Sequence, residues 1–263
     1  MGHYSDSRDL QGIEIYRDAE RLAQAVADHF VRLARQAVAN NGRFAVALAG
    51  GSTPRAAYTL LARDEFATRV DWSHVHVFWG DERCVPADHA GSNYRMAREA
   101  LLDRVPLPPE NVHRIRGELE PAKAAAEYES ALRAFFSPSA EDRQANGKTH
   151  VTRFDLILLG MGDDGHTASL FPGTAAISEH TRWVMPNFVE KLDTWRVTLT
   201  SAVINAAANV TFVVSGSGKA ERLRQVVTGP YQPDALPAQL VNPDRGRLRW
   251  LADEGAATLL KGG

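Results

Sequence analysis

Hydrophobic residues follow two patterns along this chain. In some segments they recur with the period of a helix, and in others they form short continuous runs typical of buried strands. Between Asp18 and Asn40 the apolar positions follow one another at spacings of four, four, three and four, which places them on one helix face. These positions are Leu22, Val26, Phe30, Leu33 and Ala37. The polar sequence Asn-Asn-Gly at 40–42 then interrupts the pattern, so we predict an amphipathic helix from Asp18 to Asn40.

Continuous apolar runs predict the strands. The longer runs cover residues 44–49, 75–79, 154–159 and 210–214, and shorter ones cover 183–185 and 196–200. Helical patterns lie at 54–61, 93–102 and 122–136, and another begins near Lys219. Strands that alternate with helices predict an α/β fold, a single-domain, mostly parallel, doubly wound, Rossmann-like sheet with helices on both faces.

Length and composition fit one domain. With 263 residues, of which 44% are hydrophobic, the chain is long enough to bury an ample core. We predict a single domain over residues 1–263 with a flexible amino terminus at 1–11. We predict that the polar stretch 137–150 is an exposed loop, because the alternation of strands and helices continues on both sides of it.

Charge and cysteine content exclude several classes of protein. A formal net charge of −2 leaves no basic stripe for a nucleic-acid backbone, so we expect no nucleic-acid partner. The single cysteine, Cys84, excludes an intrachain disulfide and a cysteine-rich zinc site.

The first residues lack the apolar core of a signal peptide, and no apolar run approaches the roughly 18 residues of a membrane helix. We predict a cytoplasmic protein with no membrane partner, and we expect a monomer or weak homo-oligomer.

The segment 160–172, Gly-Met-Gly-Asp-Asp-Gly-His-Thr-Ala-Ser-Leu-Phe-Pro, follows the predicted strand 154–159 directly. Open α/β sheets bind ligands at the carboxyl ends of their strands. Here that end carries His166 and Asp164, and an imidazole held in one tautomer by a carboxylate takes a proton from water near neutral pH. We predict His166 as a general base oriented by Asp164, with backbone N–H groups of the turn around Gly162 facing a developing oxyanion.

The same segment also matches the dinucleotide-binding pattern Gly-x-Gly-x-x-Gly. A lone match of this kind is weak evidence, and the aspartates at 163 and 164 would repel a pyrophosphate. We therefore predict no cofactor, and we assign the glycines to a tight turn that lets the backbone approach a small substrate.

A second glycine turn, Gly50-Gly51-Ser52-Thr53-Pro54, lies between a predicted strand and a predicted helix. The free N–H groups and positive dipole of a helix start favour an anion such as a monophosphate. Because the turn lacks the lysine of a P-loop, a nucleoside triphosphate is not expected. A capped helix after a tight turn, with no ligand, is the structural alternative for these residues.

Two further strand ends carry charged residues. The first is the triplet Asp81, Glu82 and Arg83, which follows the strand 75–79. Arg83 could bind a phosphate through its planar guanidinium, and Asp81 could bind substrate hydroxyls. A solvated loop with no binding role is the alternative for these three residues. The sequence Ser-Gly-Ser-Gly-Lys-Ala at 215–220 places Lys219 in the first turn of a helix. A lysine there opposes the helix dipole unless an anion lies nearby, so we predict that Lys219 binds phosphate.

The sequence gives little support for a metal site or a serine nucleophile. His74 and His76 have metal-like spacing and share one face of a predicted strand, but no third ligand is evident nearby, so we predict no metal. Ser52, Ser169 and Ser217 do not fit the Gly-x-Ser-x-Gly pattern of a serine nucleophile.

In order along the chain, these blocks resemble the 6-phosphogluconolactonase family, within the wider group that includes glucosamine-6-phosphate deaminases. The resemblance runs from about Ile13 to Leu260 and rests on four blocks, with a fifth, weaker block at Arg196-Val197-Thr198-Leu199-Thr200. The four are 49–54, 80–86 with 92–94, 160–172 and 215–220. The resemblance implies hydrolysis of 6-phospho-D-glucono-1,5-lactone to 6-phosphogluconate, in the oxidative pentose phosphate pathway, without cofactor or metal.

The resemblance also implies roles for individual residues. His166 would activate water, with Asp164 orienting it. The substrate-binding set would be Gly50, Gly51, Ser52, Thr53, Asp81, Arg83, Asn93, Gly162, Arg196 and Lys219. Within this set, the residues that would hold the 6-phosphate are Ser52, Thr53, Arg83 and Lys219. Arg196 would also bind the phosphate, but only its own short block resembles the family. Asp81 and Asn93 would lie near the sugar.

Two alternatives remain at this point. Deaminases share most of these blocks, but after Asp-Gly-His they resemble Ile-Ala-Phe-Asn-Glu-Pro, with a glutamate that assists ring opening. The corresponding position here is Phe171, which cannot exchange a proton. The other alternative is a non-catalytic sugar-phosphate sensor, which would need a DNA-binding module that residues 1–16 are too short to hold.

Overall fold

The computed structural model describes residues 12–137 and 153–260. Its main sheet has six strands in the order β1-β9-β8-β5-β2-β3, and all neighbouring strands are parallel. Their bounds are β1 Ile13–Tyr16, β2 Phe44–Leu48, β3 Val75–Trp79, β5 Leu156–Leu159, β8 Asn209–Val214 and β9 Arg247–Asp253. This confirms the predicted α/β class with a mostly parallel sheet.

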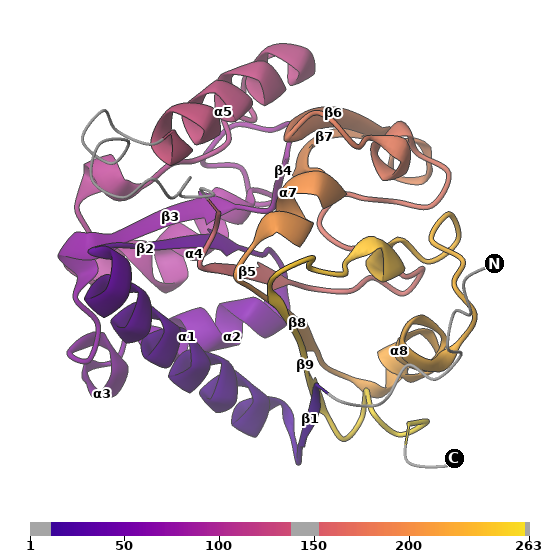
Figure 1. Cartoon of the computed structure of the whole chain (residues 1–263), viewed down its shortest axis with the longest axis horizontal. Helices are drawn as coiled ribbons and strands as arrows, with labels where there is room; N and C mark the ends of the chain where they lie inside the picture. The colour runs from indigo at the N-terminus through magenta and orange to yellow at the C-terminus, as the bar shows by residue number, and fades with distance from the viewer. Residues whose placement is uncertain (1–11, 138–152, 261–263) are drawn as a thin grey trace.

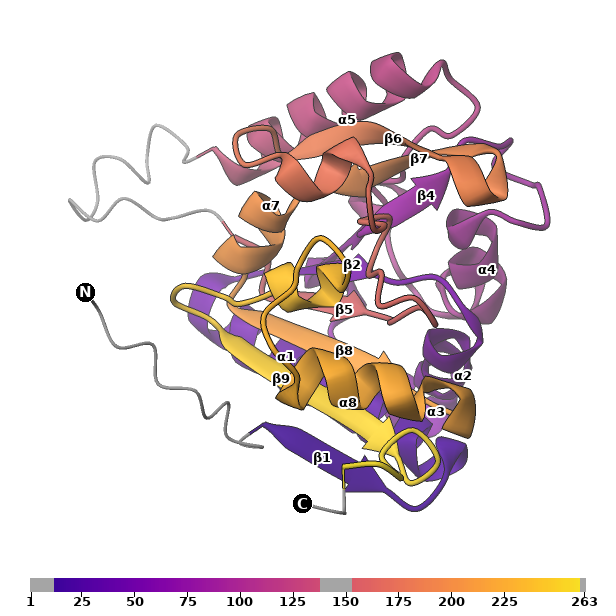
Figure 2. The same ribbon diagram turned by 90° about the vertical axis from the view of Figure 1, so that its right-hand side faces the viewer.

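Helices cover both faces of this sheet. Figures 1 and 2 show α1 and α2 on one face and α8 on the other. The helices are α1 Ala19–Asn41, α2 Ser52–Leu61, α3 Asp64–Ala67, α4 Asn93–Ala100, α5 Pro121–Phe136, α7 Ser201–Ala206 and α8 Ala220–Thr228. The buried residues form one hydrophobic core cluster that includes the central strands and the inner faces of α1, α2 and α8.

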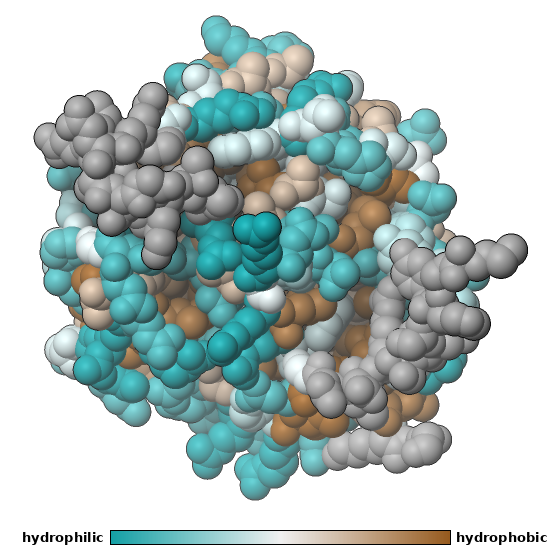
Figure 3. All heavy atoms as spheres, viewed as in Figure 1, coloured by the Kyte–Doolittle hydropathy of each residue, from teal (hydrophilic) through white to brown (hydrophobic). Residues whose placement is uncertain are grey.

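The helix α1 forms where its periodicity predicts it. Asp18 caps its first turn by accepting a hydrogen bond from the Arg21 N–H at 2.8 Å, and Gly42 ends it in the left-handed conformation with φ 73°. The predicted apolar face is buried, whereas the outer surface over α1 is mainly hydrophilic (Figure 3). Among the described residues, no helix is long and apolar enough to cross a membrane.

A second sheet was not predicted. β4 Asp81–Arg83, β7 Thr194–Leu199 and β6 Val184–Val189 form an antiparallel sheet in the order β4-β7-β6, which lies beside α5 (Figure 2). Gly80 is the branch point, because its N–H donates to the Leu48 carbonyl of the main sheet at 3.0 Å and its carbonyl accepts from the Leu199 N–H at 2.8 Å. The apolar runs at 183–185 and 196–200 are therefore strands of this sheet and not of the main one.

Some boundaries also differ from the predictions. The helix expected near Lys219 begins at Ala220, after a 3-10 turn at Ser217–Lys219. The edge strand β1 and its neighbour β9 were not predicted, since β1 has only four residues and β9 begins with charged residues among the apolar ones. The segments predicted to be a flexible terminus at 1–11 and an exposed loop at 137–150 lie outside the described residues, except for Ser137, which is exposed at the end of α5.

Candidate active site

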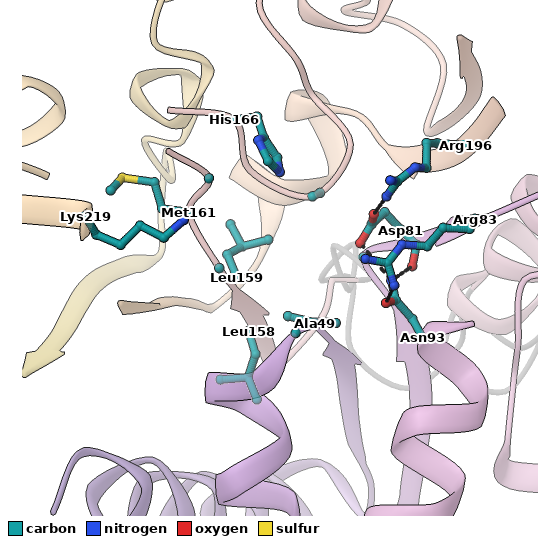
Figure 4. Close-up of a pocket in the computed structure, with 16 residues that line it drawn as sticks. Ala49, Asp81, Arg83, Asn93, Leu158, Leu159, Met161, His166, Arg196 and Lys219 are labelled. Carbon is teal, nitrogen blue, oxygen red and sulfur yellow. Dashed lines mark hydrogen bonds and ion pairs between the residues drawn. The ribbon is translucent and has the colours of Figure 1, made fainter. Parts of the chain in front are cut away.

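A cavity of about 220 Å³ opens at the carboxyl ends of β2, β3 and β5 (Figure 4). The turns that follow these strands supply most of its lining, as expected for an open α/β sheet. Nine of the residues predicted from sequence line it, namely Gly50, Gly51, Asp81, Arg83, Asn93, Gly162, His166, Arg196 and Lys219. The fold thus brings together groups that are far apart in sequence.

The imidazole of His166 is held on three sides. Its Nδ1 lies 2.6 Å from Asp164 Oδ1, and its ring stacks on Phe171 with centroids 3.9 Å apart and planes 21° apart. A Cβ atom on Gly162 would lie 2.0 Å from Nδ1, so only glycine leaves room for the ring at this position. The Gly162 N–H donates to the His166 carbonyl at 2.8 Å, which closes the turn. This N–H is therefore engaged within the turn and does not face an oxyanion as predicted.

These contacts fix the tautomer of His166. A carboxylate only accepts hydrogen bonds, so Nδ1 carries a proton, and Nε2 keeps its lone pair as long as the ring is uncharged. Burial lowers the pKa of His166 to about 4; the positive charges of Arg196 and Lys219 act in the same direction, whereas Asp81 and Asp163 oppose them. The imidazole is therefore uncharged at neutral pH, as a general base requires.

On one side of the cavity, Asp81, Arg83, Asn93 and Arg196 form a polar cluster (Figure 4). The Asn93 amide donates to the Asp81 carbonyl at 2.9 Å, and Arg83 donates to Asn93 Oδ1 and to the Gly91 carbonyl. Arg196 Nη1 lies 3.9 Å from Asp81 Oδ2. The cluster presents fixed donors and one carboxylate, an arrangement suited to a polyhydroxylated ligand.

Gly50 is required for this cluster. A Cβ atom there would lie 1.9 Å from Asn93 Oδ1, so the turn after β2 can approach the start of α4 only without a side chain. The close approach is what joins the turn at Gly50 to the Asp81 cluster.

Glu82, the middle residue of the predicted acidic triplet, is structural. Its side chain is buried on β4, which excludes the solvated-loop alternative, and it accepts four hydrogen bonds. The donors are the backbone N–H groups of Arg83, Asn93 and Tyr94 and the hydroxyl of Ser92, at 2.7–2.9 Å. Burial raises the pKa of Glu82, although these donors oppose the shift. The carboxylate thereby joins β4 to the start of α4.

We expect Glu82→Ala to destabilise the fold by about 3 kcal/mol or more, because it leaves buried donors without an acceptor. Urea unfolding followed by circular dichroism measures the change. Glu99→Ala, on the exposed face of α4, is the matched control and should scarcely move the midpoint. An unchanged midpoint for Glu82→Ala would show that water replaces the carboxylate without cost.

Lys219 lies across the cavity from Arg83, with His166 between them (Figure 4). It pairs with Asp163, whose side chain is 83% exposed. The preceding turn is fixed by Asp253, which accepts from the Ser215 hydroxyl and from the Gly216 N–H at 3.0 Å. The structure therefore does not bring Lys219 and Arg83 to one point, as a single phosphate site made from both would require.

Two other predicted residues lie beside the cavity rather than on its lining. Ser52, which is exposed, and Thr53 occupy the first turn of α2, and neither is among the lining residues of the described chain. Gly51 precedes them with φ 104°, and no side chain caps the helix start. The backbone N–H groups of this turn thus remain available to an anion.

The histidine pair considered as a metal site is not arranged as predicted. His74 ends a 3-10 turn, Trp72–His74, and contacts Asp71, whereas His76 lies on β3 and stacks on His113. The two therefore do not share a strand face. Over residues 12–137 and 153–260, no group of three or more His, Cys, Asp or Glu side chains could hold a metal ion.

Sequence reasoning missed two side chains of the site. The sequence patterns test Ser169 only as a possible nucleophile. In the structure its hydroxyl donates to Asp81 Oδ2 at 2.6 Å and thereby orients that carboxylate. The left-handed Ala168, with φ 47°, turns the chain immediately before it. Lys191, between β6 and β7, contacts Asp164. Ser169 lay within the motif that includes His166, whereas no sequence signal indicated Lys191.

Comparison with known proteins assigns this arrangement to a family. The model of the glucosamine-6-phosphate isomerases/6-phosphogluconolactonase family matches residues 17–250. The chain belongs to this family. It is 40% identical over 249 residues to a 6-phosphogluconolactonase of Nostoc sp. (strain PCC 7120), covering 94% of this chain and 98% of that protein.

Solved structures of the family share the fold. The 6-phosphogluconolactonase from Trypanosoma cruzi superposes with a TM-score of 0.83 at 29% identity, over 98% of this chain and 100% of that one. A monomeric glucosamine-6-phosphate deaminase superposes with a TM-score of 0.76 at 19% identity, over 95% and 100% of the two chains. At that identity the likeness to the deaminase is one of fold alone.

Membership of the family leaves two reactions, and Phe171 distinguishes them. Its ring stacks on His166 and is 2% exposed, and it stands at the sequence position where the deaminase pattern has a glutamate. A phenyl ring excludes water and exchanges no proton. The site therefore lacks the glutamate of the deaminase pattern beside its histidine, which favours hydrolysis of a lactone over the ring opening of an amino sugar.

Proposed function

We propose that this protein hydrolyses 6-phospho-D-glucono-1,5-lactone to 6-phospho-D-gluconate. The observation that carries the proposal is the uncharged His166, held by Asp164 and stacked on Phe171, at the wall of a cavity that also presents Arg83, Arg196 and Lys219. The similarity to 6-phosphogluconolactonases over almost the whole chain supports the same reaction.

The chemistry needs one base and an oriented substrate. His166 Nε2 takes a proton from water while the water oxygen bonds to the lactone carbonyl carbon. The tetrahedral intermediate collapses by breaking the bond between that carbon and the ring oxygen, and the imidazolium returns its proton to the ring oxygen as it leaves. The side chain of Asp164 stabilises the imidazolium between the two transfers, and general-base assistance of this kind contributes about two to four orders of magnitude.

Binding falls to the groups around the base. Asp81 and Asn93 accept and donate hydrogen bonds to the sugar hydroxyls, and Arg83 and Arg196 add positive charge beside them. Lys219 leaves Asp163 and pairs with the 6-phosphate. Breaking the ion pair with Asp163 costs little free energy, because the Asp163 side chain is largely exposed to solvent. The start of α2, with Gly50, Gly51, Ser52 and Thr53, adds N–H and hydroxyl donors to the anion.

A substrate panel tests the reaction. Purified protein is supplied separately with fresh 6-phosphogluconolactone, with glucono-1,5-lactone and with glucosamine-6-phosphate, and acid or ammonia release is followed against the spontaneous rate. We expect fast acid release from the phosphorylated lactone, far less from the unphosphorylated one, and no ammonia. Ammonia release would reassign the protein to the deaminases, and no turnover of any substrate would refute an enzymatic function of this kind.

The pH profile of kcat/KM should reflect the low pKa of His166. In the free protein the base loses activity only as it becomes protonated, and its pKa lies near 4. We therefore expect activity to remain nearly constant from neutral pH down to about pH 5, whereas an ordinary histidine would lose half of its base form near pH 6.5. Initial rates in overlapping buffers measure the profile. An acidic limb centred near pH 6.5 would contradict a buried, uncharged base.

A further inference from the structure

Three carboxylates surround the imidazole of His166, and each one contacts a cation from a different element. Asp163 pairs with Lys219 at the start of α8, and Asp81 lies 3.9 Å from Arg196 on β7. Asp164, which accepts a hydrogen bond from the imidazole, pairs with Lys191. Asp81, Asp163, Arg196 and Lys219 act electrostatically on His166, and Arg83 lines the same cavity, so the base lies among charges of both signs.

Lys191 differs from the other two cations in its position. It belongs to a short 3-10 turn, Glu190–Leu192, which connects β6 to β7 and ends at the left-handed residue Asp193. Within the described chain, Lys191 is not among the residues that line the cavity, unlike Arg196 and Lys219. It is thus placed to act on the base without contacting the substrate.

The contacts of Lys191 are with the two groups that hold the imidazole. Its ammonium pairs with Asp164 Oδ2, the oxygen that does not face His166 Nδ1. The same ammonium lies 5.0 Å from the ring centroid of Phe171, the side chain on which the imidazole stacks. The turn between β6 and β7 therefore reaches both the hydrogen-bond partner and the stacking partner of the base.

We propose that Lys191 is a positioning residue that acts through Asp164: it offsets the charge of that carboxylate, so that His166 stays held by the carboxylate yet remains uncharged. This inference rests on the proposed function only in taking His166 as the base. A carboxylate 2.6 Å from Nδ1 strongly favours the imidazolium when its charge is unopposed. Burial is the main cause of the low pKa of His166, and the charges of Arg196 and Lys219 add to it. The ammonium of Lys191 acts on the one carboxylate that is hydrogen-bonded to the ring.

The test is the titration of His166 by NMR in the absence of substrate, with its resonance assigned by comparison with His166→Gln. In Lys191→Met we expect the pKa of His166 to rise by about one unit, because the charge of Asp164 is then unopposed. Lys191→Gln should give the same rise, which covers the case in which methionine disturbs the turn. Lys191→Arg should restore the wild-type value, and Lys123→Met, on the exposed side of α5, should leave it unchanged.

Kinetics provide a second readout. The acidic limb of kcat/KM should move upward with the pKa, so that at about pH 5 the Lys191→Met protein keeps about half as much of its neutral-pH activity as the wild type does, with KM for the lactone unchanged. An unaltered titration would overturn the inference, and so would a rise in KM alone, which would make Lys191 a substrate ligand. Because the titration needs no substrate, it can fail while the lactonase activity stands, and the reverse is also true.

Discussion

Replacing His166 with alanine is expected to lower kcat for 6-phosphogluconolactone by about 10²–10⁴-fold while KM changes little. In the proposed mechanism the imidazole acts on water, whereas the charged and polar groups around the cavity hold the substrate. Removing the base therefore removes an interaction made mainly in the transition state. Steady-state rates of acid release, corrected for spontaneous hydrolysis, give both constants.

His180→Ala is the matched control for this experiment, because that histidine is exposed and does not line the cavity. Its kinetic constants should equal those of the wild type. A His166→Ala protein that keeps its kcat, or that loses activity only through KM, would show that the imidazole binds substrate and that another group activates the water.

Gly162→Ala is expected to have the second largest effect, a loss of about 100-fold in kcat. The new methyl group would lie 2.0 Å from His166 Nδ1 and 2.8 Å from Asp164 Oδ1, so the ring and the carboxylate cannot both keep their positions. A displacement of about 1 Å at the base is enough for a loss of this size. Steady-state kinetics measure the loss, and circular dichroism checks that the fold is retained.

Gly160→Ala tests whether the loss at Gly162 comes from the clash and not from stiffening the loop. Gly160 precedes the same turn, but a Cβ atom there would meet nothing within 4 Å. We expect this variant to keep most of its kcat. Equal losses at the two glycines would point to loop flexibility and would contradict the steric explanation.

The arrangement of groups around His166 could be predicted from sequence because its parts are local. Asp164 and His166 are two residues apart, and Gly162 completes the same turn. A glycine-bracketed turn after an apolar run determines both the place and the proximity of these groups. The helix α1 was predictable for the same reason, since its periodicity and both of its caps lie within one segment.

The remainder of the site depends on contacts between distant segments. Ser169 reaches Asp81 across 88 residues, and Lys191 reaches Asp164 only because β6 and β7 form a separate sheet with β4. Short apolar runs do not specify which sheet they join. The two sheets separate at Gly80, where the chain leaves the main sheet. No local sequence pattern predicts this branch point.

The placement of the cations was the hardest part to predict. Lys219 and Arg83 both follow strands of the main sheet, yet they lie on opposite sides of the cavity (Figure 4). Sequence motifs indicated that both residues belong to the site, but not which side of His166 each one occupies. That depends on the turn before Lys219, which Asp253 holds, and on the place of Arg83 on β4, where its side chain donates to Asn93.

The most direct test is the rate of acid release from freshly prepared 6-phosphogluconolactone at about pH 5.5, with the wild type and His166→Ala side by side. At this pH an ordinary histidine is mostly protonated, whereas one with a pKa near 4 is still a base. We predict fast hydrolysis by the wild type and a rate near the spontaneous one for the variant. Equal rates for the two proteins, or a wild-type rate no faster than spontaneous hydrolysis, would contradict the assignment of His166 as the base of a lactonase.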